Sequence, residues 1–194
     1  MEIVFATNNA HKLEEIRQIV GEDIRILSLR DIGCREEIPE TSDTLRGNAC
    51  QKAMYIKEHY GYDCFADDTG LMVDALGGEP GVRSARYAPG EGHDSQANMK
   101  LLLKNMEGKE DRQAHFSTVI ALLEGDRLTE FEGSVYGRIT LEPRGDSGFG
   151  YDPVFAPDEA EGLTFAQMTA EAKNAISHRG RATAKLIDYL RNKK

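Results

Sequence analysis

The sequence predicts an α/β fold in which one mixed sheet is flanked by helices, within a single domain of two lobes spanning residues 1–194. Short apolar runs alternate with stretches of helical spacing, which is typical of strands and helices that interleave along a chain. Two strand-like runs also meet at the turn signal Gly125-Asp126 and predict an antiparallel hairpin. Interleaving alone would favour a parallel sheet, so the hairpin makes the predicted sheet mixed.

The first half of the chain predicts three strands and two helices in alternation. A strand over residues 3–6 ends at Thr7-Asn8-Asn9, and the helix after it carries Leu13, Ile16 and Val20 on one face. A second strand, a second helix and a third strand follow, over residues 24–29, 45–60 and 62–66. The third strand is expected to end at two aspartates, with a glycine permitting a turn just beyond them.

The second half predicts one helix, the hairpin, an irregular loop and a closing helix. Apolar residues recur at helical spacing in both helices, and the second hairpin strand alternates apolar with polar positions. These elements cover residues 99–106, 116–123, 129–135, 144–152 and 175–190.

Composition and charge exclude several classes of function. A net charge of −9 argues against a broad basic surface for binding DNA or RNA. No apolar run approaches the ~18 residues of a membrane span, and the first residues lack the pattern of a signal peptide. The cysteines Cys34, Cys50 and Cys64 have no metal-ligand spacing, and we expect reduced thiols in a cytoplasmic protein.

Two adjacent carboxylates, Asp67 and Asp68, stand between an apolar run and Thr69-Gly70. Neighbouring carboxylates repel and raise each other's pKa, and a bound divalent cation removes that cost. Carboxylate oxygens are the ligands that Mg²⁺ prefers. The motif therefore indicates a magnesium site, and a simple polar turn is the alternative that this motif alone leaves open.

A phosphate site is indicated at Thr7-Asn8-Asn9-Ala10-His11-Lys12, where a strand passes into a helix. The first N–H groups of a helix and the positive end of its dipole suit a phosphate. Lys12 adds a point charge within the first turn. The alternative is an ordinary N-cap beside an incidental surface lysine.

Two motifs nearer the C-terminus indicate a planar, acceptor-rich ligand. In Phe149-Gly150-Tyr151-Asp152-Pro153 an aromatic ring can stack on a base and Asp152 can accept from a base N–H, although the loop can equally be a turn with a packed ring. Ser177 stands at a predicted N-cap, so His178 and Arg179 would open the last helix. Cations there oppose the helix dipole unless an anion or acceptor-rich ligand faces them.

In this order the four motifs resemble those of the inosine triphosphatase (Ham1-like) family, over essentially the full chain. The resemblance implies hydrolysis of deaminated or oxidised purine nucleotides, such as ITP, dITP and XTP, to the monophosphate and pyrophosphate. It further implies an active-site cleft between the two lobes and a homodimer. A non-catalytic purine-nucleotide sensor is the alternative function, and Glu40, Asp67 and Asp68 argue against it.

The resemblance also assigns roles to individual residues. Mg²⁺ would bind Glu40 and Asp68, with Asp67 as a further candidate ligand, and Asp68 would activate the attacking water. The residues that would bind the nucleotide are Thr7, Asn8, Asn9, Ala10, His11, Lys12, Lys52, Thr69, Phe149, Gly150, Tyr151, Asp152, Lys173, His178 and Arg179.

Two finer expectations concern the base and the metal. By resemblance, Phe149 would lie against the base, and His178 and Arg179 would donate to its 6-oxo edge, where adenine instead presents an amino group. One position departs from the family, because Gly47 stands where a carboxylate is common, close to the expected metal site. We expect this departure to alter the magnesium dependence.

Overall fold

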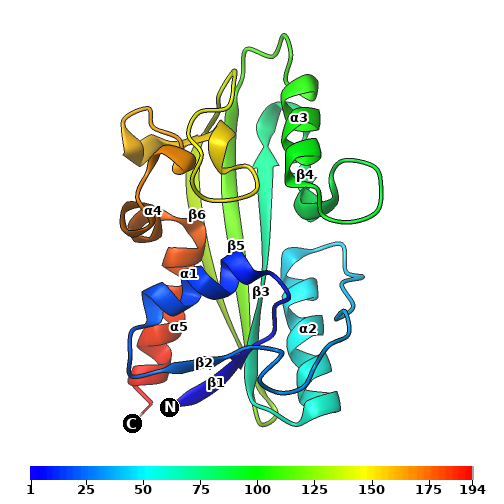
Figure 1. Ribbon diagram of the computed structural model, residues 1–194, viewed down its shortest axis with the longest axis vertical. Helices are drawn as coiled ribbons and strands as arrows, with labels where there is room; N and C mark the ends of the chain where they lie inside the picture. Colours follow the sequence, from blue (N-terminus) through cyan, green and yellow to red (C-terminus); the bar gives the residue numbers. More distant parts are fainter. Residues whose placement is uncertain (194) are drawn as a thin grey trace. The chain divides into compact units, whose positions relative to one another are not determined.

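The computed structural model of the chain describes residues 1–193 and contains a seven-stranded sheet with helices beside it (Figure 1). The strands are β1 (Glu2–Phe5), β2 (Arg25–Leu27), β3 (Cys64–Val73), β4 (Pro80–Gly81), β5 (Gln113–Glu124), β6 (Arg127–Ile139) and β7 (Phe155–Pro157). The α-helices are α1 (Ala10–Val20), α2 (Leu45–Tyr60), α3 (Ser95–Asn105), α4 (Ala170–Ile176) and α5 (His178–Arg191). Short 3₁₀ helices cover Asp74–Leu76, Ser84–Arg86, Asp152–Val154, Asp158–Ala160 and Phe165–Gln167.

The sheet is mixed, as predicted. Its order is β2-β1-β3-β5-β6-β7, and β4 pairs with β3 outside this path. β1 runs parallel to both β2 and β3, whereas β4 is antiparallel to β3 and β7 is antiparallel to β6. β5 and β6 form the predicted hairpin around Gly125-Asp126.

Two local predictions are wrong. β3 does not end at Asp67-Asp68 but continues through Thr69-Gly70, because the apolar residues beyond them pair with β4 at Leu71 and Met72. The last helix is preceded by the short helix α4, and the chain breaks between the two at Ser177, whose backbone is extended (φ −68°, ψ 157°). Ser177 therefore separates two helices, and His178 opens the second of them as predicted.

The chain folds into two compact units. The first comprises Met1–Asp68, Thr118–Gly133 and the chain from Arg179 onward, and the second comprises Thr69–Ser117 and Ser134–His178. β3, β5 and β6 contribute residues to both units. The cleft expected from the resemblance stays a prediction.

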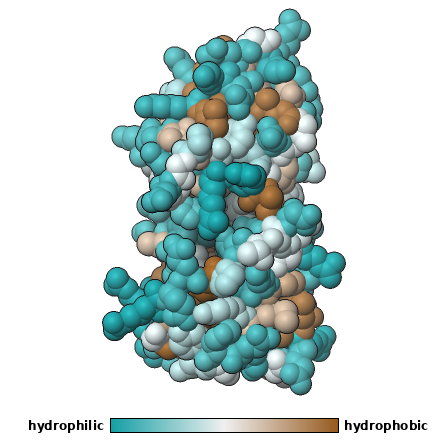
Figure 2. Space-filling model, turned by 90° about the vertical axis from the view of Figure 1, so that its right-hand side faces the viewer, coloured by the Kyte–Doolittle hydropathy of each residue, from teal (hydrophilic) through white to brown (hydrophobic). Residues whose placement is uncertain are grey.

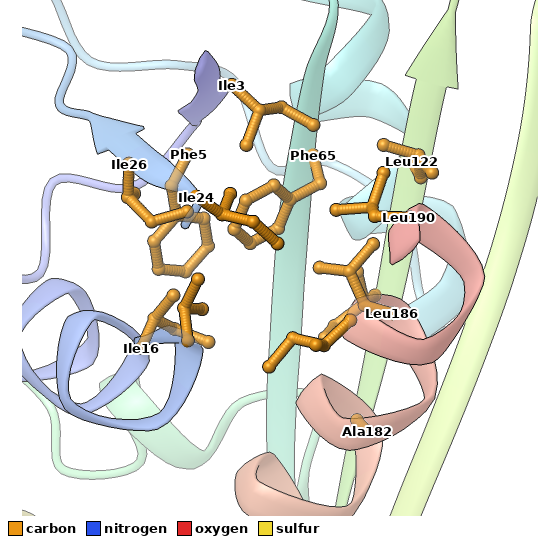
Figure 3. Close-up of a cluster of buried hydrophobic side chains, with 13 residues drawn as sticks. Ile3, Phe5, Ile16, Ile24, Ile26, Phe65, Leu122, Ala182, Leu186 and Leu190 are labelled. Carbon is orange, nitrogen blue, oxygen red and sulfur yellow. The ribbon is translucent and has the colours of Figure 1, made fainter. Parts of the chain in front are cut away.

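Side-chain alternation along β1 and β3 divides the core of the first unit in two. Phe5 and Phe65, paired across the parallel strands, stack with ring centroids 4.6 Å apart in a cluster with α1 and α5 (Figure 3). Val4 and Ala66 point to the opposite face and pack with the α2 residues of a second cluster. Each face of the sheet in this unit is therefore covered by its own helices.

The second unit has a core of its own, built around aromatic rings. Phe116 meets Phe155 edge to face, with centroids 4.7 Å apart, and Phe165 packs beside them. Buried residues of β3 and α3, among them Leu71 and Leu102, complete this cluster.

The face of the molecule shown in Figure 2 is mainly hydrophilic. The face shown in Figure 2 carries only small, separate hydrophobic groups. Within residues 1–193, none of the helices combines the length and apolar character needed to cross a membrane. The cysteines Cys34, Cys50 and Cys64 are all free thiols, as expected.

Candidate active site

β3 places the two adjacent aspartates on opposite faces of the sheet. Asp67 lies on the face of Phe65, towards α1 and α5, and Asp68 lies on the face of Ala66, towards α2. Both carboxylates are buried. β3 is continuous through both residues, and the two carboxylates accept hydrogen bonds from different residues, although Lys12 and Lys52 act on the charge of both.

Asp67 is neutralised by cations of the protein itself. Its Oδ1 accepts a hydrogen bond from Lys12 Nζ at 3.1 Å, and its Oδ2 accepts one from Arg179 Nε at 3.2 Å. Burial alone would raise the pKa of Asp67, but the nearby Lys12, Arg179 and Lys52 outweigh it and hold that pKa well below its ordinary value. Asp67 is therefore an ionised carboxylate held between buried cations.

Arg179, the second residue of α5, is the largest fully buried side chain within residues 1–193. Its guanidinium also forms an ion pair with Glu15. Two carboxylates therefore supply the anionic partner that a cation at a helix start requires, and the structure gives Arg179 a role inside the protein. Contact of Arg179 with the base stays a prediction.

Glu15 was not identified from the sequence. Its ion pair with Arg179 joins residues 164 positions apart, a separation that no local pattern reveals. One signal was available, because Glu15 stands three residues after Lys12 in α1, on the same side of that helix, and next to the buried Ile16.

Lys52, on α2, connects the loop before that helix to β3. Its Nζ forms an ion pair with Glu40 at 2.7 Å and donates to the backbone oxygen of Asp67. Burial would lower the pKa of Lys52, but Asp67, Glu40 and Asp68 outweigh it and raise that pKa. Lys52 is therefore a buried ammonium ion that holds Glu40 near the strand.

Asp68 differs from Asp67 in its protonation. Burial raises the pKa of Asp68 to about 6, against the opposing effects of Lys52 and Lys12, and Glu40 raises it further. Its Oδ2 accepts a hydrogen bond from Asn48 Nδ2 at 3.1 Å. A carboxylate whose pKa lies near the working pH suits a general base.

The residues around Asp68 fit a magnesium ion with few protein ligands. Within residues 1–193, no group of three or more His, Cys, Asp or Glu side chains could hold a metal ion. Mg²⁺ needs only one or two carboxylates, because water and substrate phosphates complete its shell. Glu40 and Asp68 are the carboxylates that would supply these ligands. Glu40 raises the pKa of Asp68, and a cation would relieve the repulsion behind this rise. Asp67 points to the other face.

The predicted phosphate loop lies at the junction of β1 and α1. Asn9 caps α1, and its Oδ1 accepts from the backbone N–H groups of His11 (3.0 Å) and Lys12 (3.2 Å). Thr7 Oγ1 in turn accepts from Asn9 N. Asn8 and Ala10 complete the turn. The ordinary N-cap that the sequence left open is thus present, and phosphate binding here stays a prediction.

The aromatic loop belongs to the second unit. Asp152 Oδ2 accepts from Lys173 Nζ at 2.7 Å and from Phe149 N at 3.0 Å, and Lys173 Nζ lies 4.9 Å from the centre of the Phe149 ring. Tyr151 donates its hydroxyl hydrogen to the backbone oxygen of Ser84 at 2.6 Å. Asp152 therefore organises the loop itself, in which Gly150 separates the two aromatic residues.

His178 lies in the same unit as the aromatic loop. Its ring stacks on Phe116 with centroids 4.5 Å apart and an interplanar angle of 15°. The residues expected to meet the base, except Arg179, and the half-buried Thr69 thus belong to the second unit. Those expected to meet phosphates and metal belong to the first, except Lys173, which is expected to stabilise the departing pyrophosphate.

Gly47 fills a position where no side chain fits. Its backbone N–H donates to Thr44 Oγ1, the N-cap of α2, at 3.0 Å. A Cβ atom on residue 47 would overlap Ser42 Oγ and lie 2.6 Å from Ser42 Cβ. The conformation of the Ser42–Thr44 turn therefore requires a residue without a side chain at position 47.

We expect Gly47→Glu to lower the free energy of unfolding by about 1–3 kcal/mol, because the new side chain must displace Ser42. Adding Ser42→Gly removes the two nearest obstructing atoms and leaves Thr44 Oγ1 as the next atom, at 2.9 Å, so the double variant should recover most of the loss. Urea unfolding of the parent, both single variants and the double variant measures this coupling. A Gly47→Glu variant as stable as the parent would show that the turn moves without cost.

Comparisons with known proteins agree with this geometry. Residues 3–189 match the Ham1 family. The dITP/XTP pyrophosphatase of Flavobacterium johnsoniae is 54% identical over 191 residues, with 98% of each chain covered. That of Porphyromonas gingivalis is 53% identical over 190 residues, with 97% of each covered. The Staphylococcus aureus Ham1 protein superposes with a TM-score of 0.89 at 35% identity over 100% of both chains. A HAM1 protein from Coxiella burnetii superposes with a TM-score of 0.89 at 36% sequence identity, with 99% of each chain covered.

Proposed function

Because the chain belongs to the Ham1 family, we propose that it hydrolyses dITP, ITP and XTP to the monophosphate and pyrophosphate and so removes these purines from the nucleotide pool. The support is identity above 50% to dITP/XTP pyrophosphatases over nearly the whole chain. The observation that carries the proposal is Asp68, a buried carboxylate with a raised pKa beside Glu40 and Lys52.

The charges of the first unit support hydrolysis of a phosphoanhydride, which needs charge neutralisation and an oriented water. The buried or half-buried charges of this unit include four carboxylates and three cations. The carboxylates are Asp67, Asp68, Glu15 and Glu40, and the cations are Lys12, Lys52 and Arg179. This excess of negative charge favours the binding of a divalent cation. When bound, Mg²⁺ neutralises phosphate oxygens and lowers the pKa of bound water. Glu40 and Asp68 are the residues that would hold it.

The side chains around this network have separate tasks in the proposed reaction. Asp68 accepts a proton from the attacking water, which general-base catalysis requires. The ammonium groups of Lys12 and Lys52 stabilise the negative charge of the departing pyrophosphate. Because Lys52 stays charged while buried, its effect on a phosphate is stronger than in water.

Choice of base is assigned to the second unit. Phe149 and His178 offer ring faces, and the imidazole of His178 also offers an N–H donor. A 6-oxo purine accepts from such a donor, whereas the amino group of adenine leaves it unpaired, and an unpaired buried donor is costly. We therefore expect discrimination against ATP.

The direct test is a nucleotide panel assayed for pyrophosphate and orthophosphate, with and without Mg²⁺. We expect dITP, ITP and XTP to be cleaved much faster than ATP or GTP, with pyrophosphate as the co-product. In isotopically labelled water the label should enter the monophosphate, because water attacks the phosphorus nearest the sugar. Tight nucleotide binding without turnover would instead identify a sensor, and direct release of orthophosphate would overturn the proposed attack.

The assembly and cellular setting are also part of the proposal. We infer that the chain forms one domain, dimerises with a second copy and works in the cytoplasm. Three free thiols are typical of a reducing compartment, and the dimer is supported by the family resemblance. Sedimentation equilibrium should give twice the mass of one chain, and thermal unfolding should be one cooperative transition.

The stabilisation by Mg²⁺ should depend on pH. Since folding raises the pKa of Asp68 from 3.8 to about 6, the contribution of Asp68 to the stability of the metal-free protein falls as pH rises through this interval. Mg²⁺ requires the ionised carboxylate, so it should raise Tm more at about pH 7.5 than at about pH 5. Calorimetry at both values, with Asp68→Asn as control, measures the difference. If Mg²⁺ raised Tm equally at both pH values, Asp68 would be excluded as a magnesium ligand.

A further inference from the structure

We infer that Asn48, on α2, is a positioning residue for Asp68. Its side-chain amide donates to Oδ2 and fixes the plane of the Asp68 carboxylate, so that the carboxylate is held in one orientation towards the attacking water. Only the last step rests on the proposed function. The orientation itself follows from the contacts of the amide.

The amide of Asn48 has one chemically permitted orientation. One end faces the backbone N–H of Ser42, with a distance of 2.8 Å from Ser42 N. Because a backbone N–H only donates, this end must be the oxygen Oδ1. The other end is therefore the NH₂ group, and it lies 3.1 Å from Asp68 Oδ2.

Asn48 is itself held firmly. It lies in the first turn of α2 and is 4% exposed. The next residues on the inner face of the helix, Ala49 and Ala53, pack against Ala66 of β3 in one cluster. A hydrogen bond between buried groups is stronger than one in water, and leaving either partner unpaired is costly. The bond therefore restrains rotation of the Asp68 carboxylate.

Restrained rotation matters for a general base. The base must lie within about 2.6–3.2 Å of the water it deprotonates, in a suitable direction. A carboxylate that rotates spends less time in that geometry, and the rate falls without loss of nucleotide affinity. Loss of Asn48 should consequently lower kcat more than it raises KM.

The competing explanation is that Asn48 only anchors the loop that carries Glu40. Gln51, one turn further along α2, provides a matched control. Its Oε1 accepts from Thr41 N at 2.8 Å and its Nε2 donates to Thr41 Oγ1 at 2.9 Å. Gln51 thus anchors the same loop through two hydrogen bonds, neither of which involves Asp68.

Three variants separate the two explanations. Asn48→Asp keeps the acceptor for Ser42 N and replaces the donor to Asp68 with a carboxylate oxygen that repels it, Asn48→Ala removes both contacts, and Gln51→Ala loosens only the loop. We expect both Asn48 variants to lose about 10- to 100-fold in kcat, as for other residues that orient a reacting group through one contact. Gln51→Ala should keep the parent kcat, and nucleotide affinity in EDTA should be similar in all. The inference would be overturned in favour of loop anchoring if Asn48→Asp kept the kcat of the parent while Asn48→Ala and Gln51→Ala both lost kcat.

A second measurement does not depend on activity. Crystal structures of the parent and of Asn48→Asp should show the Asp68 carboxylate turned about χ2 in the variant, with α2 and β3 unchanged. An unmoved carboxylate would refute the inference whether or not the protein cleaves dITP. A turned carboxylate in a protein that releases no pyrophosphate from dITP would refute the proposed function instead and leave the orientation by Asn48 standing.

Discussion

Asp68→Asn should lower the turnover of dITP by about 10²- to 10⁴-fold, the usual contribution of a general base, while nucleotide binding persists. The substitution keeps the shape of the side chain and removes its charge and basicity. Asn48 Nδ2, which donates to Asp68 Oδ2 at 3.1 Å, can donate equally to an amide oxygen there. Because burial disfavours the ionised carboxylate, the neutral variant should be at least as stable as the metal-free parent.

Asp67→Asn is the matched control for this prediction, because it makes the same chemical change one residue away on the opposite face. Asp67 forms ion pairs with Lys12 and Arg179. Its loss should therefore lower Tm clearly and reduce kcat less than Asp68→Asn does. Single-turnover rates, nucleotide affinity and Tm of both variants distinguish the two effects. If Asp68→Asn kept near-normal turnover and Asp67→Asn had none, Asp67 would be the general base and Asp68 the structural residue.

Most of the fold could be predicted because its strands and helices carry strong local patterns. The alternation of Val4 and Phe5, or of Phe65 and Ala66, reflects a sheet with a helix layer on each face. The helix α4 was missed because its seven residues are too few to show a clear apolar period.

The candidate site could be predicted only in part, and the reason is physical. Motifs identify residues that carry chemistry, such as Asp68, but the counter-charges come from distant parts of the chain. Arg179 and Glu15, 164 positions apart, form an ion pair only after folding. Without that partner, a cation at a helix start suggested an external anion, whereas the protein supplies its own.

Arg179→Ala should lower the free energy of unfolding by about 3–5 kcal/mol, because it leaves buried carboxylates without their cation. The guanidinium contacts both Asp67 and Glu15, and all three side chains are largely or fully buried. Burial would otherwise favour neutral carboxylates. The loss should therefore be greatest at neutral pH and smaller in acid, where protonation of the stranded carboxylates removes the unpaired charges.

Arg191→Ala tests whether burial, rather than the ion pair itself, sets this cost. Arg191 lies on the same helix and bridges Asp23 with two hydrogen bonds, but both side chains are about half exposed. Exposed pairs contribute little, so this variant should stay close to the parent in urea unfolding. Combining Arg179→Ala with Glu15→Gln should cost less than the sum of the single changes, since the double variant removes one of the stranded charges. Equal losses for Arg179→Ala and Arg191→Ala would contradict the buried network. If Arg179→Ala were as stable as the parent and had lost only its discrimination against ATP, Arg179 would act at the base.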